Sequence, residues 1–380
     1  MLMAGEASGD LLAAELVAAL RERLPDARFF GAGGQKMSAA GVELAFDMTQ
    51  HAVIGISDVL TNYFKFRRLF NQLLALAIER KPDAVIGVDY GAFNLRLDHA
   101  LRQLVRNRSG DWNPKIIQFV SPQVWASRPG RAKRLQADCD LLLSIFPFEK
   151  GWYAQHAPKL RVEFVGHPMV DRFASEGRVT RVPDSKMRTR NARPSEVLLL
   201  PGSRASELRR HLPVMLAALK LIQAKLPNAK ATVVLPDERL VQQATSLGAN
   251  LDIQAGHLPQ ALAQADVAIA STGTVTMECA FLGVPTVTLY KTSWLTYAIG
   301  RRIVTVKSLT MPNLLAGEEV YPEFIQGAAT PASIANAALE LLQDESRRQK
   351  IKSQLAKIVA SLGAPGAANR AAAAIMSLLK

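Results

Sequence analysis

The sequence predicts an α/β protein built from two doubly wound domains, each a parallel sheet covered by helices. Two observations carry this prediction. Short apolar runs alternate with longer amphipathic runs through the first half of the chain, and the alternation starts again in the second half. A polar, charged stretch over residues 171–194 separates the halves. Strand, helix and strand in alternation imply right-handed crossovers and therefore parallel strands.

The expected elements follow from the periodicity of the apolar residues. The predicted strands are Leu2–Ala4, Ala27–Phe30, Ala84–Val88, Ile116–Val120, Leu141–Ile145, Val162–Val165, Val197–Leu200, Ala231–Leu235, Leu251–Ile253, Val267–Ala270 and Thr286–Tyr290. The predicted helices include Leu11–Leu24, Leu60–Arg80 and Leu95–Arg106, and helices after Pro331 that break at Gly363–Gly366. The expected domains are 1–170 and 195–345, joined by a linker at 171–194, with C-terminal helices at about 350–380 packing back on the first domain. Because ligands bind at the carboxyl ends of such strands, we expect the site in a cleft between the domains.

Composition narrows the class of protein. The hydrophobic fraction of 49% excludes a disordered chain. The two cysteines, Cys139 and Cys279, are far apart, which argues against a disulfide framework and favours a reducing compartment. The sequence predicts neither a membrane-spanning helix nor a signal peptide. The net charge of +13 predicts a phosphate-bearing partner, either nucleic acid, anionic lipid or an anionic substrate, and composition does not choose among them.

The motif GEASGD (Gly5–Asp10) joins the first strand to the first helix. Its glycines permit close backbone approach, and Ser8 or Asp10 can cap the helix. A plain turn between strand and helix would explain the glycines. It would not explain Glu6, whose carboxylate we expect to face the site.

Asp89 follows the apolar run Ala84–Val88, which predicts a strand buried on both faces. An acid at the carboxyl end of a parallel strand is well placed to act as a general base. The alternative is that Asp89 caps the next helix.

A basic segment, Ser121–Leu135, follows the next strand and contains Trp125 and Arg128. Such a loop can hold a phosphorylated acceptor, although a solvated basic helix face has the same pattern. His167, at the end of a later strand, is open to a structural or a catalytic role. The spacing of the other histidines does not suggest a metal site, and we predict no metal.

The second half carries two motifs typical of diphosphate binding. The PGSR turn ends in Arg204, which can neutralise a diphosphate or pair with Glu207. After the strand Val267–Ala270 comes a small-residue turn that suits a pyrophosphate, made of Ser271, Thr272, Gly273 and Thr274. Glu278, about one turn later, can accept hydrogen bonds from ribose hydroxyls. This turn, a helical glutamate and a G-x-P turn at 283–285 are together typical of nucleotide-sugar transferases.

The segment Val59–Phe70 combines an apolar helical stripe with flanking cations. Apolar burial and attraction to anionic head groups add together in helices that lie on membranes. A core helix with a solvated basic edge is the alternative. The predicted membrane patch consists of Val59, Leu60, Tyr63, Phe64, Phe66 and Phe70.

Together these motifs resemble the lipid-A-disaccharide synthase family. The matching stretches run in order along nearly the whole chain: GEASGD (5–10), GVDYGAFN (87–94), SPQVWA (121–126), FPFEK (146–150), FVGHPMVD (164–171), LLPGSRASE (199–207), STGTVTME (271–278) and MPNLLAGEEVYPEFIQ (311–326). The resemblance implies a GT-B fold and an inverting glycosyltransferase of lipid A biosynthesis. Such an enzyme joins UDP-2,3-diacylglucosamine to 2,3-diacylglucosamine 1-phosphate, releases UDP and needs no cofactor.

The resemblance also implies roles for individual residues. It makes Asp89 and Glu6 the catalytic pair, and it places Arg204, Glu278 and the turn 271–274 on the UDP side. The predicted acceptor-side residues are Ser8, Asn94, Ser121, Trp125, Arg128, His167 and Asn313. The sequence departs from the family at Gly91 and Ala92, where a proline and a second acid are common, and at Ser127, where the family has a tryptophan.

Because both substrates carry acyl chains, the predicted location is cytoplasmic, with peripheral association at the inner face of the inner membrane. The predicted partners are the two substrates and the anionic membrane surface. The sequence does not decide whether the protein forms a homodimer. Three alternatives also stay open: another GT-B UDP-sugar transferase acting on a lipid-linked acceptor, a sugar-nucleotide epimerase, and a nucleic-acid-binding protein. Against the last, the sequence has no RNP motif, zinc pattern or repeated stacking aromatics.

Overall fold

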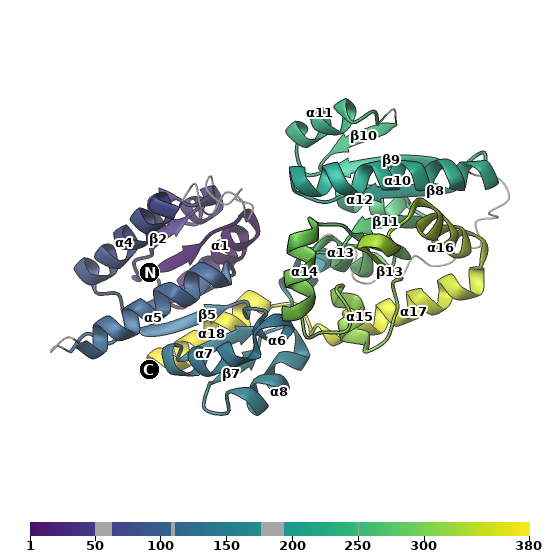
Figure 1. Cartoon of the computed structure of the whole chain (residues 1–380). Coiled ribbons are helices and arrows are strands. Elements are labelled where there is room, and N and C mark those ends of the chain that lie inside the picture. Colours follow the sequence, from purple (N-terminus) through teal and green to yellow (C-terminus); the bar gives the residue numbers. More distant parts are fainter. Residues whose placement is uncertain (50–62, 108–110, 176–193, 250) are drawn as a thin grey trace. The chain divides into compact units, whose positions relative to one another are not determined.

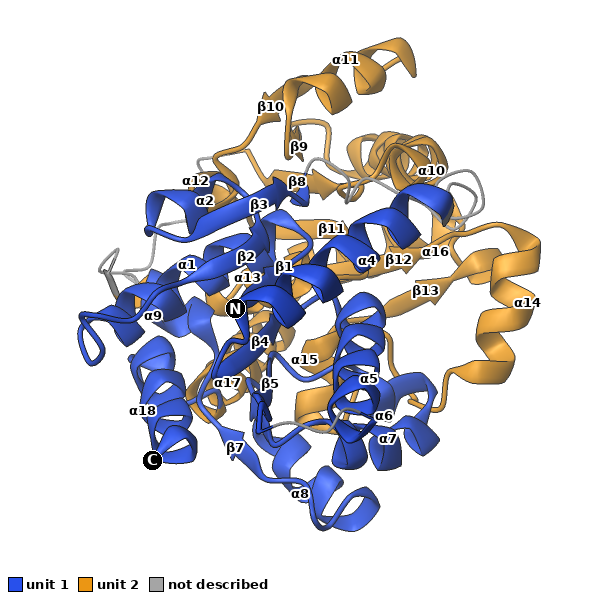
Figure 2. Ribbon diagram, turned by 90° about the vertical axis from the view of Figure 1, so that its left-hand side faces the viewer, with its two compact units in different colours: residues 1–172, 362–380 blue, residues 173–361 orange. Residues whose placement is uncertain are grey.

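A computed structural model describes residues 1–49, 63–107, 111–175, 194–249 and 251–380 (Figure 1). They form two compact α/β units, of which unit 1 comprises residues 1–172 and 362–380 and unit 2 comprises residues 173–361 (Figure 2). The predicted fold class, two parallel sheets covered by helices, is confirmed. Residues 176–193, which make up most of the predicted linker, lie outside the described residues.

Unit 1 is built on a seven-stranded parallel sheet in the order β3-β2-β1-β4-β5-β6-β7. Its strands are β1 (Leu2–Ala4), β2 (Phe30–Gly33), β3 (Glu43–Asp47), β4 (Ala84–Val88), β5 (Lys115–Phe119), β6 (Leu141–Ser144) and β7 (Val162–Phe164). The central strands are almost entirely buried, which is why their sequences are continuous apolar runs.

The helices of unit 1 connect successive strands, and a last one returns from the C-terminus. They are α1 (Ala7–Arg21), α2 (Gln35–Ala39), α4 (Tyr63–Arg80), α5 (Gly91–Asn107), α6 (Val124–Ser127), α7 (Ala132–Asp138), α8 (Pro147–His156), α9 (Pro168–Ser175) and α18 (Ala367–Leu379), with a 3₁₀ turn η2 (Pro129–Arg131). The Asp171 carboxylate fixes the start of α18 because it accepts the backbone N–H groups of Gly366 and Ala367, the latter at 3.0 Å. Arg370 on α18 donates from Nε to the Val165 carbonyl at 2.8 Å.

Unit 2 has a six-stranded parallel sheet in the order β10-β9-β8-β11-β12-β13. Its strands are β8 (Glu196–Leu200), β9 (Lys230–Leu235), β10 (Asp252–Ala255), β11 (Val267–Ser271), β12 (Thr286–Tyr290) and β13 (Glu323–Ile325). Its helices are α10 (Ala205–Lys225), α11 (Glu238–Ser246), α12 (Leu258–Gln264), α13 (Val275–Phe281), α14 (Trp294–Ile303), α15 (Met311–Ala316), α16 (Pro331–Gln343) and α17 (Glu345–Ser361), with a 3₁₀ turn η4 (Gln326–Ala328).

The differences from the sequence-based elements lie mainly at the sheet edges. The sequence did not predict β3 and β13, whose residues are all exposed or half-buried and therefore lack an apolar run. Strand β2 covers Phe30–Gly33 instead of Ala27–Phe30. Of the C-terminal helices, α18 belongs to unit 1 and α17 to unit 2. In the described part of the chain, every helix is too short or too polar to cross a bilayer.

Candidate functional site

In unit 1 the strand order reverses direction between β1 and β4, which are neighbours in the sheet. The carboxyl ends of strands at such a switch point form the usual ligand-binding crevice of a doubly wound sheet. GEASGD follows β1 and Asp89 follows β4. The fold therefore brings together the two motifs that the sequence assigns to catalysis.

The turn from β4 into α5 has an unusual backbone. Asp89 and Tyr90 have positive φ angles of 53° and 50°, a conformation that side chains other than glycine adopt infrequently. The Asn94 carboxamide holds the turn, because its Nδ2 donates to the Asp89 carbonyl at 2.6 Å. Strained residues of this kind persist only where surrounding contacts over-determine them, and they cluster at functional sites.

The Asp89 carboxylate is held from both sides. Its Oδ1 accepts the Tyr90 N–H at 2.9 Å, and its Oδ2 lies 3.5 Å from the Ser8 hydroxyl, which can donate to it. Burial raises the pKa of Asp89 above its ordinary value, although the hydrogen bonds from Tyr90 and Ser8 act in the opposite direction. A carboxylate with a raised pKa is a stronger proton acceptor once it is ionised.

Glu6 comes shortly after β1, at the same edge of the sheet where Asp89 follows β4. It is the N-cap residue of α1, and its side chain makes no cap hydrogen bond. The Tyr90 ring packs against Gly5, where an added Cβ would lie 2.3 Å from the ring, so only glycine fits. Burial raises the pKa of Tyr90 above its ordinary value, and the negative charge of Glu6 adds to this effect.

The predicted capping of α1 by Ser8 or Asp10 is wrong. Asp10 is buried and caps α2 instead, since its carboxylate accepts the backbone N–H groups of Gly34, Lys36 and Met37 at 2.7 to 3.1 Å. Ser8 is exposed and points toward Asp89. Of the two acids of GEASGD, Asp10 is therefore structural, and the role of Glu6 in the site stays a prediction.

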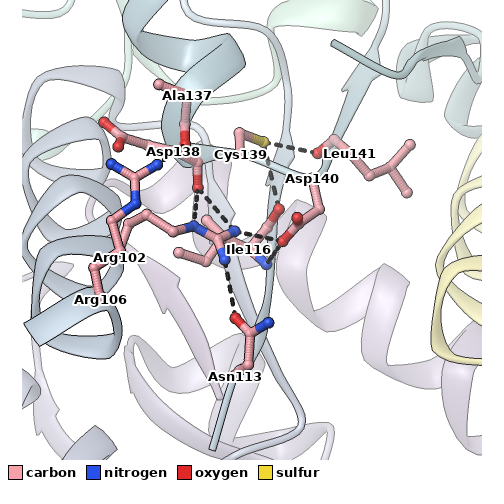
Figure 3. Close-up of polar contacts among 9 residues, drawn as sticks. All are labelled: Arg102, Arg106, Asn113, Ile116, Ala137, Asp138, Cys139, Asp140 and Leu141. Carbon is pink, nitrogen blue, oxygen red and sulfur yellow. Dashed lines mark hydrogen bonds and ion pairs between the residues drawn. The ribbon is translucent and has the colours of Figure 1, made fainter. Parts of the chain in front are cut away.

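Helix α5 is fixed along its length. Near its start, Asn94 and Asp98 are buried, and Asp98 accepts a 2.6 Å hydrogen bond from the Gln118 carboxamide on β5. Further along, Arg102 makes an ion pair with Asp140 at 2.6 Å and donates to the Asp138 carbonyl and to the Asn113 side chain (Figure 3). Asp140 also accepts the Ile116 N–H at 2.7 Å, which links the helix to β5. These contacts hold the helix that carries the Asp89 turn.

The loop after β5 is mostly internal. It begins at Val120, a β-branched residue with φ of 70°. Ser121 is buried with its hydroxyl 3.0 Å from that of Tyr153, and the Trp125 indole donates to Glu149 at 3.0 Å. Burial raises the pKa of Glu149 to about 7. Arg128 is exposed.

His167 lies after β7, three strands away from β4. Its ring is buried and its Nδ1 accepts the Met169 N–H at 3.2 Å. Burial lowers the pKa of His167 to about 4, so the ring is neutral at physiological pH. These contacts suit the structural role that the sequence left open.

Unit 2 uses its own switch point, between β8 and β11. Arg204 follows β8 as the N-cap residue of α10, with an exposed side chain 3.5 Å from Glu207. Glu207 also accepts the Ser203 N–H at 3.1 Å, which shapes the PGSR turn. The turn that follows β11 has a buried Ser271 at its start and exposed residues at Gly273 and Thr274. The two predicted diphosphate motifs therefore follow adjacent strands, β8 and β11.

The remaining predicted site residues of unit 2 are less exposed. Thr272 is half-buried and its N–H donates to the Leu289 carbonyl at 3.2 Å. Glu278 is half-buried on α13. Asn313 is buried, and its carboxamide bonds the backbone of Val320 and Tyr321 and the carboxylate of Glu323 at 2.8 to 2.9 Å.

Several predicted acceptor-side residues are thus internal in this structure. Buried side chains with hydrogen-bond partners inside their own unit occur at Asn94, Ser121, Trp125, His167 and Asn313. They hold backbone in place, and their contact with an acceptor stays a prediction. Ser8 and Arg128 are the exposed members of that set.

The predicted membrane patch divides in the structure. Val59 and Leu60 lie outside the described residues, as does the side chain of Tyr63. Phe66 and Phe70 pack against the core of unit 1, and Phe70 meets Phe93 edge-on at 5.7 Å between ring centroids. Their spacing on one stripe reflects core packing, and their assignment to the exposed patch is corrected. Phe64, with 79% exposure, is the described member that faces solvent.

Sequence reasoning missed three features of the site. Tyr90, which packs on Gly5 near Glu6, carried no signal beyond its place in the motif. The positive φ angles of Asp89, Tyr90 and Val120 are not encoded by a glycine. The buried pair of Asp98 and Gln118 looked like ordinary positions on a helix and a strand.

Comparison with known proteins gives concordant results over the full chain. The model of the family described as lipid-A-disaccharide synthetase matches residues 1–377. The lipid-A-disaccharide synthase of Myxococcus xanthus is 36% identical over 383 residues, which cover 100% of this chain and 97% of that protein.

Solved structures share the fold at low sequence identity. A putative UDP-N-acetylglucosamine 2-epimerase from Listeria monocytogenes is 14% identical, with a TM-score of 0.64 and coverage of 100% of this chain and 96% of its own. The glycotransferase of kitacinnamycin is 17% identical, with a TM-score of 0.60 and coverage of 98% and 97%. These likenesses confirm the predicted GT-B fold.

The burial of Asp98 predicts how the stability of the protein depends on pH. Its complete burial holds its pKa well above the ordinary value in the folded protein, and the charge of Asp138 adds to this. The folded state therefore keeps a proton that the unfolded chain releases near pH 4, and the free energy of unfolding falls as the pH rises through that window. We expect Asp98→Asn to remove this fall and to be at least as stable as the wild type at pH 7. Urea unfolding of the wild type and the variant from pH 4 to pH 8 measures the free energy of unfolding. A variant with an unchanged pH dependence would show that Asp98 does not titrate there.

Proposed function

The chain belongs to the lipid-A-disaccharide synthetase family, and from this membership we propose that it joins UDP-2,3-diacylglucosamine to 2,3-diacylglucosamine 1-phosphate and releases UDP. The family is one of glycosyltransferases of lipid A biosynthesis. The two substrates and the roles of individual residues are our proposal. It is supported by the match to a relative over 97% of that protein's length and by the geometry at Asp89.

The observation that carries the proposal is the placement of Asp89. Its carboxylate stands at the switch point of unit 1, on a strained turn, with its pKa raised by burial and with the Ser8 hydroxyl 3.5 Å away. Structural caps do not require this arrangement. Within the described residues, the one backbone N–H group that the Asp89 carboxylate accepts is that of the adjacent Tyr90, so Asp89 caps nothing there beyond its own turn.

In the proposed reaction, Asp89 accepts the proton of the acceptor hydroxyl while that oxygen attacks the anomeric carbon of the donor. The bond from the anomeric carbon to the diphosphate oxygen breaks, and its electron pair leaves with UDP. Attack from the face opposite the leaving group inverts the anomeric centre. Glu6 is proposed to add negative charge to this part of the site, which favours transfer of the proton to Asp89.

Unit 2 supplies the groups proposed for the leaving diphosphate. Arg204 is exposed at the end of β8 and faces charge that grows as the bond to UDP breaks. The exposed Gly273 and Thr274 lie at the end of the neighbouring strand and are proposed to contact the phosphates. Glu278 is proposed to accept hydrogen bonds from the ribose.

A further part of the proposal concerns the membrane. On α4, Phe64 is exposed beside Arg67 and Arg68, and these residues line a shallow hollow of about 510 Å³ together with Asn71, Gln72 and Ala75. An apolar side chain with adjacent guanidinium groups suits an anionic lipid surface. We therefore propose that the outer face of α4 helps to dock the protein at the inner membrane, where the acylated substrates reside.

The role of Asp89 as general base provides the test of the proposed function. In an assay of UDP release with both acylated substrates, Asp89→Asn should fold normally and lose turnover by about 10²–10⁴-fold, the usual effect of losing a general base. Donor binding should be retained. The exposed Asp26→Asn is the matched control and should keep full rate. A near-wild-type rate in Asp89→Asn would mean that the base lies elsewhere.

The two nucleotide-side residues should respond differently. Loss of a hydrogen bond to a charged group costs about 1.5–3 kcal/mol, so Glu278→Ala should weaken UDP binding by roughly tenfold or more. Arg204→Ala should lower kcat by about 10²-fold and change UDP affinity less, because its partner charge develops in the transition state. Calorimetric titration with UDP and steady-state kinetics separate these effects. Arg209→Ala, one turn along α10, serves as the control. Equal small effects in both variants would exclude the assignment.

The α4 proposal predicts a contrast between two neighbouring phenylalanines. Phe64→Ser should lower binding to anionic vesicles and leave the melting temperature unchanged, because Phe64 is exposed. Phe66→Ser removes a side chain that packs on the core and should cost about 2–4 kcal/mol of stability. Vesicle sedimentation and thermal unfolding measure the two effects. Unchanged vesicle binding by Phe64→Ser would remove α4 from the docking surface.

A further inference from the structure

A second apolar surface lies on unit 2, on helix α14 and the residue that follows it. None of the residues of α14 is buried. Trp294, Leu295 and Ile299 are 79%, 64% and 51% exposed, and Val304 is 37% exposed. Four of the eight large apolar side chains that are exposed in the described part of the chain thus fall in this short segment. Figure 2 shows α14 at the right-hand edge of unit 2.

The segment is pinned at both ends, so its exposure is a built feature of the fold. At its entry, the Thr292 N–H donates to the Gln326 side chain at 3.0 Å, and the Gln326 carboxamide donates back to the Thr292 carbonyl at 3.1 Å. Beyond its exit, the following loop is fixed where the Glu323 carboxylate accepts the N–H groups of Leu309 and Thr310 at 2.8 and 2.9 Å. A helix fixed in this way presents its apolar side chains outward.

The charged residues within this stretch of sequence are all cations. From Lys291 to Gly317 the sequence contains no aspartate or glutamate. The exposed cations Arg301, Arg302 and Lys307 follow the apolar residues. Trp294, Leu295 and Ile299 occupy the first two turns of α14, while the cations occupy its last turn and the segment after it, where Val304 also lies. A helix with apolar residues beside cations combines the two attractions that hold helices at anionic bilayers.

The size of the surface also favours lipid over protein. At their exposures, the four apolar side chains present on the order of 400 Å². A stable protein interface buries about 800 Å² on each partner. A bilayer needs no matching surface, and an exposed tryptophan is a side chain favoured at the boundary between head groups and acyl chains.

We propose that α14 is a lipid-docking helix of unit 2 that inserts Trp294, Leu295 and Ile299 into the interfacial layer of an anionic bilayer, with Arg301, Arg302 and Lys307 at the phosphate level. This surface is separate from the outer face of α4, which belongs to unit 1. The proposal deepens the proposed function and rests on it in one respect: acylated substrates give the enzyme a reason to bind a bilayer.

Trp294 provides a direct readout. The chain has four tryptophans, all within the described residues, and the other three are buried or half-buried. With vesicles of equal parts phosphatidylglycerol and phosphatidylcholine, tryptophan emission should shift to shorter wavelength and be quenched by lipids brominated on the acyl chains. Trp294→Phe should lose both changes while still binding the vesicles. No shift in the wild type under conditions where it binds vesicles would overturn the proposal.

The contribution of α14 to binding is measured with a triple variant, Trp294→Ser, Leu295→Ser and Ile299→Ser. Because none of these side chains is buried, we expect unchanged thermal unfolding and a fall in the vesicle partition coefficient of about tenfold or more. The control Leu221→Ser with Leu247→Ser removes exposed apolar side chains elsewhere in unit 2 and should bind as the wild type does. A second variant, Arg301→Gln with Arg302→Gln, should lose roughly fivefold per charge on anionic vesicles and little on pure phosphatidylcholine.

The outcomes separate this proposal from the proposed function. Unchanged vesicle binding by the triple variant overturns the docking role of α14, whatever the transfer activity in detergent micelles. If the triple variant loses vesicle binding, the docking role of α14 is supported. If the wild type also fails to transfer the sugar in micelles, the proposed reaction is overturned while the docking role stands. A dimer of the wild type in sedimentation equilibrium that dissociates in the triple variant shows that the surface is covered by a second copy, and this also overturns lipid docking.

Discussion

The hydrogen bond from the Asn94 carboxamide to the Asp89 carbonyl is the contact on which the site of unit 1 depends. It stabilises two consecutive left-handed residues, which would otherwise be strained. That conformation ends β4, starts α5 and turns the Asp89 carboxylate back toward its own Tyr90 N–H and toward Ser8. The helix that carries Asn94, α5, is itself fixed by the Asp98–Gln118 hydrogen bond and by the ion pair between Arg102 and Asp140.

The two units apply the same topological rule to different chemistry. In each sheet the strand order reverses once near the middle, and the candidate residues follow the two strands that flank the reversal. Unit 1 places half-buried carboxylates there, which suits proton transfer. Unit 2 places an exposed arginine and a turn of small residues there, which suits a diphosphate. This division fits a transfer reaction with a proton to remove from one substrate and a charged leaving group to stabilise on the other.

Much of the fold could be predicted because buried parallel strands are continuous apolar runs. Strands β4 and β12 match their predicted ranges, whereas the edge strands β3 and β13 mix polar and apolar residues and gave no such signal. The location of Asp89 at a strand end could be predicted, but its backbone could not, since neither Asp89 nor Tyr90 signals a positive φ. Periodicity placed Phe64, Phe66 and Phe70 in one patch, and only tertiary packing shows that the last two belong to the core. No helix was predicted at α14, and only the structure shows that its apolar residues are exposed.

The most direct test of Asp89 as the base is the pH dependence of kcat/KM for sugar transfer. A base must be ionised to accept a proton, so the rate should rise with pH as Asp89 loses its own proton and then level off. Burial raises the pKa of Asp89, so we expect this rise to be centred above the ordinary aspartate value of 3.8. The rise should be absent from the residual activity of Asp89→Asn. An identical rise in that variant would assign the proton transfer to another group and contradict the central role given to Asp89.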